Sequence, residues 1–99
     1  MNEINDLVLL YDFYGELLSE SQRKYFEDYY FNNLSLSEIS ENLDVSRSAV
    51  QKQIKISEKK LYEYDDILKL VEKNNKLIKL KEKITDENIR KELDEIIES

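Results

Sequence analysis

The stretch that decides the fold spans residues 34–54 and reads LSLSEISENLDVSRSAVQKQI. Its first half predicts a helix, because Ser35 and Glu38 have the spacing of a capping box, in which each side chain accepts from the other's free backbone amide. The apolar residues that follow recur at helical spacing and form one stripe, made of Leu36, Ile39 and Leu43. The stretch therefore opens with a short amphipathic helix.

The second half of the stretch predicts a tight turn and another helix. The turn falls at Asp44-Val45, without the glycine often found there, and Ser46 is placed to cap the next helix. Five apolar side chains are expected to close over one another across the turn: Ile39, Leu43, Val45, Val50 and Ile54. Two helices joined in this way form a helix-turn-helix unit, whose second helix can enter the major groove of DNA.

Composition favours an all-α protein of one domain. The chain has 99 residues, no proline and a single glycine, Gly15, so it contains few residues that interrupt helices. We expect a three- to four-helix core within about residues 19–61, with a long second motif helix that continues into a helical extension over about 62–99. The whole chain, 1–99, is predicted to form a single domain.

The residues that are missing exclude several functions. The chain has no cysteine and no histidine, which removes thiolate metal sites and the commonest general base. It also has no glycine-rich phosphate loop, and its carboxylates alternate with lysines as on solvated helices. We therefore expect no enzyme, no metal and no cofactor. With no membrane-spanning run and no basic leader at the N-terminus, the expected location is the cytoplasm.

Two further helices are predicted before the motif. The first covers about residues 4–18 and includes Gly15, which indicates close packing against a neighbour; its buried stripe is Leu7, Leu10, Tyr14 and Leu17 or Leu18, with Tyr11 beside it. The second begins at a capping box formed by Ser19 and Gln22. It carries a cluster of aromatic residues: Tyr25, Phe26, Tyr29, Tyr30 and Phe31. This cluster is interpreted as core, and the alternative is a stacking platform for single-stranded nucleic acid.

Beyond the motif, apolar and small residues follow a heptad-like seam to about residue 83, with a break expected at Asn74-Asn75. The seam consists of Val50, Ile54, Ser57, Leu61, Tyr64, Leu68, Val71, Asn75 and Ile78. Thr85 is expected to cap a last helix, whose stripe is Ile89, Leu93 and Ile96 or Ile97. Two interpretations stay open: the last two helices fold as a hairpin against the first helix, or the seam forms a homodimer interface through Leu61, Tyr64, Leu68 and Val71.

The charge distribution indicates where nucleic acid would bind. The net charge is −7, which is unusual for a nucleic-acid-binding domain. The stretch from Arg47 to Lys60, however, contains five bases and one acid, Glu58. The candidates for base contacts are Arg47, Ser48, Gln51 and Lys52, and those for phosphate contacts are Lys55 and Lys59. The alternative is the ordinary solvated face of a soluble helix.

These residues resemble the YlxM family of small bacterial helix-turn-helix proteins. The most specific match is Leu34–Ile39 followed by Asp44–Arg47 and Ala49-Val50. Further matching segments are Asp12-Phe13-Tyr14, Ser21–Tyr25, Glu63-Tyr64 and the acidic last helix. The motif is also similar to the fourth region of sigma factors. The chain departs from the family's usual residues at Ser48, Gln51, Lys52 and Ile56, so a DNA target read there would differ.

The resemblance implies a fold like sigma region four and a regulatory role in the signal recognition particle pathway, whose GTPase gene is expected nearby. The leading hypothesis is a DNA-binding regulator of duplex DNA. The competing hypothesis is a protein-binding module that keeps the helix-turn-helix shape and acts directly on the signal recognition particle GTPase.

Overall fold

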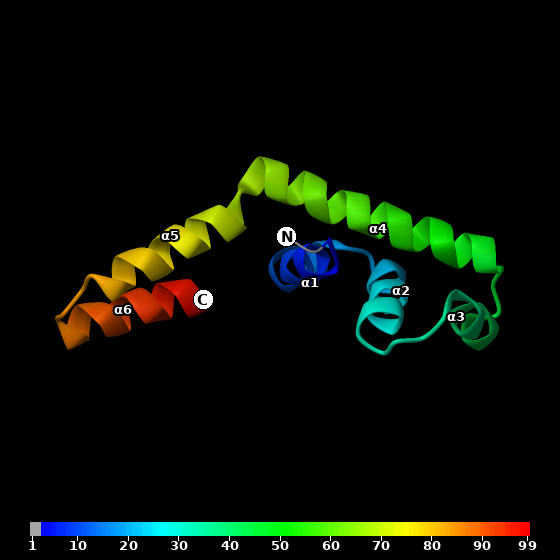
Figure 1. Ribbon diagram of the computed structural model, residues 1–99, viewed down its shortest axis with the longest axis horizontal. Coiled ribbons are helices and arrows are strands. Elements are labelled where there is room, and N and C mark those ends of the chain that lie inside the picture. The colour runs from blue at the N-terminus through cyan, green and yellow to red at the C-terminus, as the bar shows by residue number, and fades with distance from the viewer. Residues whose placement is uncertain (1–2) are drawn as a thin grey trace. The chain divides into compact units, whose positions relative to one another are not determined.

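The computed structural model describes residues 3–99, and these residues form six α-helices, one 3-10 helix and no strand (Figure 1). The all-α prediction is confirmed. The elements, in chain order, are α1 (Glu3–Tyr14), η1 (Gly15–Leu17), α2 (Glu20–Tyr30), α3 (Leu36–Leu43), α4 (Arg47–Leu68), α5 (Leu70–Glu82) and α6 (Glu87–Glu98).

The chain groups into two compact units, an N-terminal unit of residues 1–68 and a C-terminal unit of residues 69–99. The N-terminal unit contains the motif and the whole of α4. The C-terminal unit contains α5 and α6, which pack against each other. That residues 1–99 fold as one domain stays a prediction.

The N-terminal unit is assembled on α4. The helices α1, α2 and α3 all pack against it, and Figure 1 shows them side by side along its length. Four residues of α4 form the buried stripe: Val50, Ile54, Ser57 and Leu61. Ser57 has no exposed surface, and its hydroxyl donates to the Gln53 carbonyl at 2.8 Å, so this polar group is satisfied inside the core.

The first helix is shorter than predicted. It ends at Tyr14 and passes into η1. Leu7, Leu10 and Tyr14 are buried as expected, and of the two alternatives at the end of the stripe Leu18 is buried and Leu17 is exposed. Gly15 does mark a close approach, but the neighbour is Tyr11 of the preceding turn. A Cβ at residue 15 would lie 2.9 Å from Cε2 of that ring.

The aromatic cluster of α2 is core only in part. Phe26 is fully buried, and the centre of its ring lies 4.6 Å from the ring centre of Tyr11 and 4.5 Å from that of Tyr30. Tyr29 and Phe31 are exposed, so the core interpretation is wrong for these two rings. The reason is that five aromatic residues within seven positions span more of the helix surface than one buried face can cover. The predicted capping box of Ser19 and Gln22 is confirmed.

The helix-turn-helix unit forms as predicted. Ser35 and Glu38 make the capping box of α3, and Asp44 ends that helix in the left-handed region at φ 54°, taking the place of the absent glycine. The Ser46 hydroxyl accepts from the amide of Ala49 at 3.1 Å. The shared core consists of Ile39, Val50 and Ile54, with Tyr25, Tyr30, Leu34, Leu36 and Leu43 packed around it.

Val45 corrects the predicted core. It is 38% exposed and lies outside the cluster, because it belongs to the turn between α3 and α4 rather than to either buried stripe.

The C-terminal unit corrects two predicted boundaries. The long helix breaks at Lys69, in the left-handed region at φ 53°, and not at Asn74-Asn75, which lie inside α5. The last helix is capped by Asp86 rather than Thr85, because the Asp86 carboxylate accepts from the amides of Asn88 and Ile89. The seam is therefore not one continuous surface.

Candidate nucleic-acid interface

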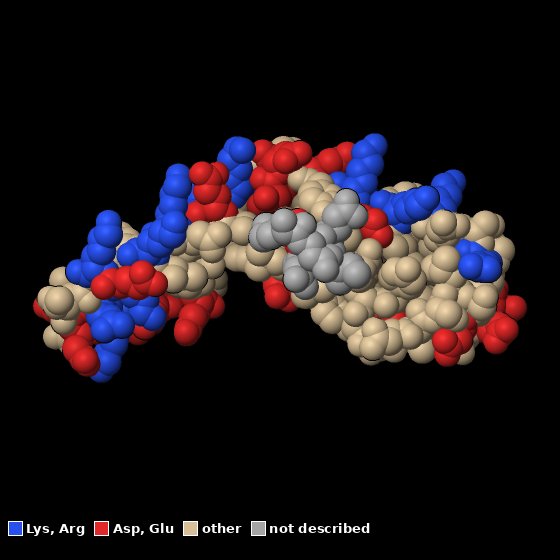
Figure 2. All heavy atoms as spheres, in the orientation of Figure 1, with Lys and Arg blue, Asp and Glu red and all other residues tan. Residues whose placement is uncertain are grey.

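All six predicted contact residues lie on α4 and are exposed: Arg47, Ser48, Gln51, Lys52, Lys55 and Lys59. They occupy the first three to four turns: Ser48, Lys52, Lys55 and Lys59 lie opposite the buried stripe, and Arg47 and Gln51 lie on its shoulder. Figure 2 shows Lys and Arg gathered along α4 toward its N-terminal end, and Asp and Glu toward its C-terminal end. The structure therefore brings the six residues onto one solvent-facing helix surface, the α4 face.

The packing of α4 holds this face in a fixed orientation. Its buried stripe is anchored by three helices, and Tyr14 of α1 adds a hydrogen bond from its hydroxyl to Asp65 at 2.7 Å. The first turn of α4 has no acidic residue, so the positive end of the helix dipole reinforces Arg47. This combination attracts phosphate at the N-terminal end of the helix.

The only acid between Arg47 and Lys60 points toward α2. The Glu58 carboxylate accepts a hydrogen bond of 2.8 Å from the Tyr30 hydroxyl. Burial of the Tyr30 side chain raises its pKa, and the hydrogen bond to Glu58 raises the pKa further, so the phenol stays protonated and keeps donating. Sequence reasoning missed this pair, whose two residues lie on different helices and 28 positions apart in the chain.

The cationic side chains of the face differ in how far they are already paired. Lys59 lies 3.9 Å from Glu63, one turn along α4, and both side chains are largely exposed. Within the described part of the chain, Arg47, Lys52 and Lys55 form no ion pair. Exposed pairs of this kind contribute little, so Lys59 can exchange its partner for a phosphate.

A cleft of about 140 Å³ lies beside the α4 face, between α2, α3 and α4. It is lined by Tyr29, Tyr30, Leu36, Gln51, Ile54, Lys55 and Glu58. Two of these residues, Gln51 and Lys55, are also predicted DNA contacts, so the cleft borders the candidate interface. The adjacent tyrosines of α2 are the sequence signal that would have located it.

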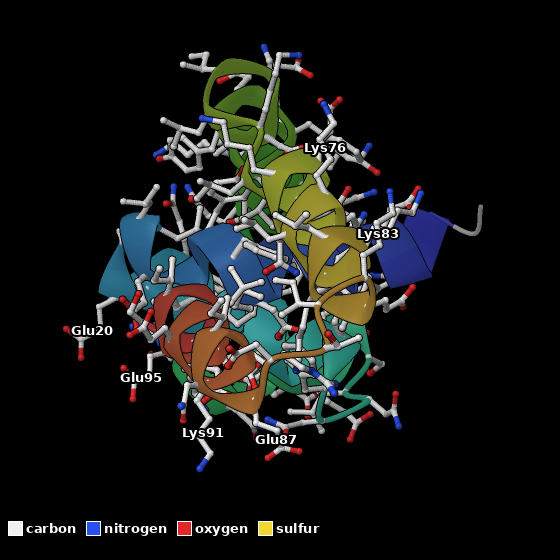
Figure 3. The ribbon with its side chains drawn as sticks, turned by 90° about the vertical axis from the view of Figure 1, so that its left-hand side faces the viewer. Glu20, Lys76, Lys83, Glu87, Lys91 and Glu95 are labelled. Carbon is white, nitrogen blue, oxygen red and sulfur yellow. The ribbon has the colours of Figure 1, made fainter. Side chains whose placement is uncertain are left out.

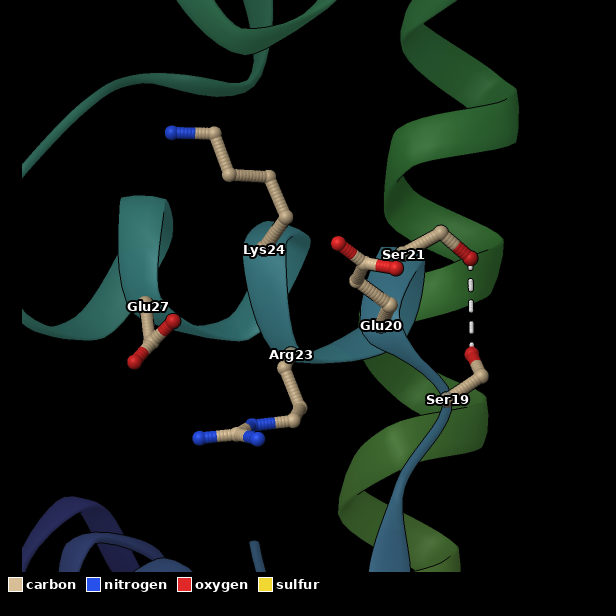
Figure 4. Close-up of a pocket in the computed structure, with 6 residues that line it drawn as sticks. All are labelled: Ser19, Glu20, Ser21, Arg23, Lys24 and Glu27. Atoms are coloured by element: carbon tan, nitrogen blue, oxygen red, sulfur yellow. Dashed lines mark hydrogen bonds between the residues drawn. The ribbon is translucent and has the colours of Figure 1, made fainter. Parts of the chain in front are cut away.

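A larger hollow of about 810 Å³ lies at the start of α2 (Figure 4). Ser19, Glu20, Ser21, Arg23, Lys24 and Glu27 line it. Its two bases are engaged within the unit: Arg23 donates to the Tyr11 hydroxyl at 3.4 Å, and Lys24 pairs with Asp28 at 3.1 Å. With acids and bases mixed and both bases occupied, this hollow carries no separate chemistry.

Residues 3–99 lack two other kinds of site. The described side chains include no group of three or more acidic residues placed to hold a metal ion. None of the described helices is long and apolar enough to cross a membrane.

Over residues 1–99 the sequence matches the family described as "Putative helix-turn-helix protein, YlxM / p13 like". The chain belongs to this family. The YlxM-like resemblance seen in the motif residues is thereby confirmed, and the structure supplies the helix-turn-helix in α3, the turn and α4.

Individual relatives extend along most of the chain. A UPF0122 protein of Caldanaerobacter subterraneus is 50% identical over 78 residues, which cover 79% of this chain and 67% of the relative. A UPF0122 protein of Fusobacterium nucleatum is 41% identical over 101 residues, which cover 98% of each chain. A Bacillus thuringiensis relative is 43% identical over 95 residues, covering 91% of this chain and 86% of its own. The similarity therefore reaches beyond the motif to the C-terminal unit.

Proposed function

We propose that this YlxM-like protein is a non-enzymatic regulator that binds duplex DNA through the α4 face. The observation that carries the proposal is the exposure of Arg47, Lys52 and Lys55 on one face, while the neighbouring Glu58 is engaged by Tyr30 of α2. An exposed basic helix face on a helix-turn-helix unit has the form and charge that the major groove accepts.

The two turns nearest the N-terminus of α4 are assigned to the bases. Arg47 and Lys52 suit guanine and Gln51 suits adenine, whereas the Ser48 hydroxyl can contact either base. Lys55 and Lys59, farther along α4, are assigned to phosphates. Because the whole chain carries a net charge of −7, this face must provide nearly all of the attraction for DNA, and binding without a specific site is expected to be weak.

The test is duplex binding by matched double variants. Lys55→Ala/Lys59→Ala should weaken binding to every sequence, whereas Lys79→Ala/Lys91→Ala, which removes the same charge from the C-terminal unit, should leave it nearly unchanged. Arg47→Ala and Gln51→Ala should mainly reduce discrimination between sequences. Equal losses for the two double variants would contradict an α4 contact.

A second candidate is a protein-binding module that regulates the signal recognition particle GTPase directly. Two observations favour it: the acidic net charge opposes phosphate, and α2 presents two exposed aromatic rings, Tyr29 at the cleft and Phe31 at the end of the helix, as protein interfaces commonly do. A complex with the GTPase that survives Lys55→Ala/Lys59→Ala but is lost in Tyr29→Ala/Phe31→Ala would select this role. Either role, including control of that pathway's operon, places the protein in the cytoplasm.

A further inference from the structure

The C-terminal unit has an incomplete core. Neither α5 nor α6 contains a fully buried residue. The side chains between the two helices are only half-buried: Leu77, Ile84, Leu93 and Ile97, together with the ion pair between Lys81 and Asp94. Two helices of 13 and 12 residues bury too little apolar surface to stabilise themselves, and association is one of the ways in which units of this size are completed.

A second apolar surface flanks this interior. Leu80 is 51% exposed, Ile89 50% and Ile96 64%. Leu80 comes one residue before the inward Lys81, and Ile96 one residue before the inward Ile97. Antiparallel helices are related by a local twofold axis perpendicular to their common plane. Residues with the same offset from an inward position therefore lie on the same side of the hairpin.

This surface is charged in opposite senses on its two helices. The helix α5 contains four lysines and two glutamates, whereas α6 contains five acidic and two basic residues. Lys73 and Lys76 lie seven and four positions before Leu80, on the same face of α5, and Glu92 lies between Ile89 and Ile96 on α6. Figure 3 shows Lys76 of α5 and Glu95 of α6 pointing away from the interior of the hairpin. The hairpin flank is the surface formed by Lys73, Lys76, Leu80, Ile89, Glu92 and Ile96.

We propose that the hairpin flank binds a second copy of this chain, forming a four-helix bundle in which α5 of each copy packs against α6 of the other. In such a bundle each hairpin of α5 and α6 forms one layer, and a twofold axis can relate the two layers in two ways. An axis perpendicular to the helices places α5 on α5 and α6 on α6, which opposes like charges. An axis parallel to the helices places the basic α5 on the partner's acidic α6, and this arrangement matches the charges.

This surface replaces the dimer seam predicted from the sequence. Leu61 of that seam is fully buried in the N-terminal unit, so it is not available to a partner. The hairpin flank also lies on a different unit from the α4 face. Association through the flank can therefore be measured without DNA, and its failure would be distinct from a failure of DNA binding.

The first experiment is sedimentation equilibrium of the full chain between about 1 and 100 μM, the range in which small interfaces associate. We expect a monomer–dimer equilibrium. Ile89→Asp/Ile96→Asp should weaken the dimer by about 100-fold or more, because it removes two apolar side chains from the interface. The control is Leu17→Asp, which changes an equally exposed apolar residue of the N-terminal unit and should leave the dimer unchanged.

The second experiment exchanges the charges and leaves Lys81 and Asp94 intact. Glu92→Lys/Glu95→Lys makes both helices basic, and Lys73→Glu/Lys76→Glu makes both acidic. Each variant alone should be mostly monomeric, and an equimolar mixture of the two should recover a dimer. The losses in the separate variants are expected only when α5 of one copy meets α6 of the other, because packing α5 on α5 opposes like charges before and after either exchange. These losses therefore also distinguish the two twofold arrangements. Circular dichroism checks that each variant keeps its helices.

Three results would overturn the proposal. The first is a chain that stays monomeric up to about 100 μM, because such a weak self-association is below that of a specific interface. The second is a dimer that is insensitive to Ile89→Asp/Ile96→Asp, and the third is a mixture of the charge variants that stays monomeric. If the apolar variant instead lowers the melting temperature of a strict monomer, the flank packs within its own chain.

Discussion

The two units of this protein are both helical, yet they differ in what holds them together. Every buried apolar residue among those described lies in the N-terminal unit, from Leu7 to Leu61, and the C-terminal unit has none. The helix α6 nevertheless separates apolar from polar residues more sharply than α1 does. Amphipathic sequence alone therefore does not make a core, because a stripe is buried only where enough other elements cover it.

The largest effect is expected at the centre of the N-terminal unit. Phe26→Ala should lower the free energy of unfolding by about 3–5 kcal/mol, since the ring is fully buried between two tyrosines, and Ile39→Ala or Ile54→Ala by about 2–5 kcal/mol. Chemical denaturation measures both. Losses below about 0.5 kcal/mol at Ile39 and Ile54 would contradict the packing of the motif described here.

Gly15→Ala should destabilise the same unit by about 1–3 kcal/mol, because the new methyl group must displace the Tyr11 ring. That ring is stacked on Phe26, and its hydroxyl accepts from Arg23, so it has little freedom to move. Tyr11→Leu in the Gly15→Ala background should recover part of the loss. A neutral Gly15→Ala would mean that the ring relaxes without cost.

Tyr30→Phe should cost about 1 kcal/mol through the lost hydrogen bond to Glu58. The pKa of Tyr30 is raised in the folded protein above the ordinary value of 10.0, so the folded state holds the phenolic proton more tightly than the unfolded chain. Its contribution to stability is complete below pH 10 and is lost as the pH rises from there through the folded pKa. The free energy of unfolding, measured between about pH 8 and 11, should therefore fall less steeply with pH for Tyr30→Phe than for the unchanged protein. Parallel pH profiles would contradict this reasoning.

The smallest effect is expected in the C-terminal unit of the dilute protein. Leu93→Ala should cost less than about 1 kcal/mol at submicromolar concentration, because the side chain is only half-buried there. The same change should cost more at concentrations at which the proposed dimer forms. A cost as large as that of Ile39→Ala at every concentration would remove the contrast between the two units.

The starts of three helices, α2, α3 and α4, were the most predictable features. Ser19, Ser35 and Ser46 cap the helices predicted for them, because capping depends on residues within one turn of each other. The buried stripe from Val50 to Leu61 and the exposure of the six α4 candidates follow from the helical period alone. Local rules therefore fixed the fold class and the surface that carries the candidate site.

Features that depend on distant contacts or on backbone strain were not predictable. The helix breaks at Lys69, a residue with no breaking signal, whereas Asn74-Asn75 continue α5. The pairing of Tyr30 with Glu58 depends on how α2 packs against α4, and neither residue type predicts it. Whether the α4 face contacts DNA cannot be read from its spacing, because a solvated helix face carries the same residues.

The salt dependence of duplex binding tests the central claim most directly. With Arg47, Lys52, Lys55 and Lys59 on one face, the logarithm of the binding constant should fall with the logarithm of salt concentration at a slope of about −3 to −4. Lys55→Ala/Lys59→Ala should flatten that slope by about 2. An absence of duplex binding at low salt up to about 100 μM protein, or a slope unchanged in the double variant, would contradict recognition of DNA by the α4 face.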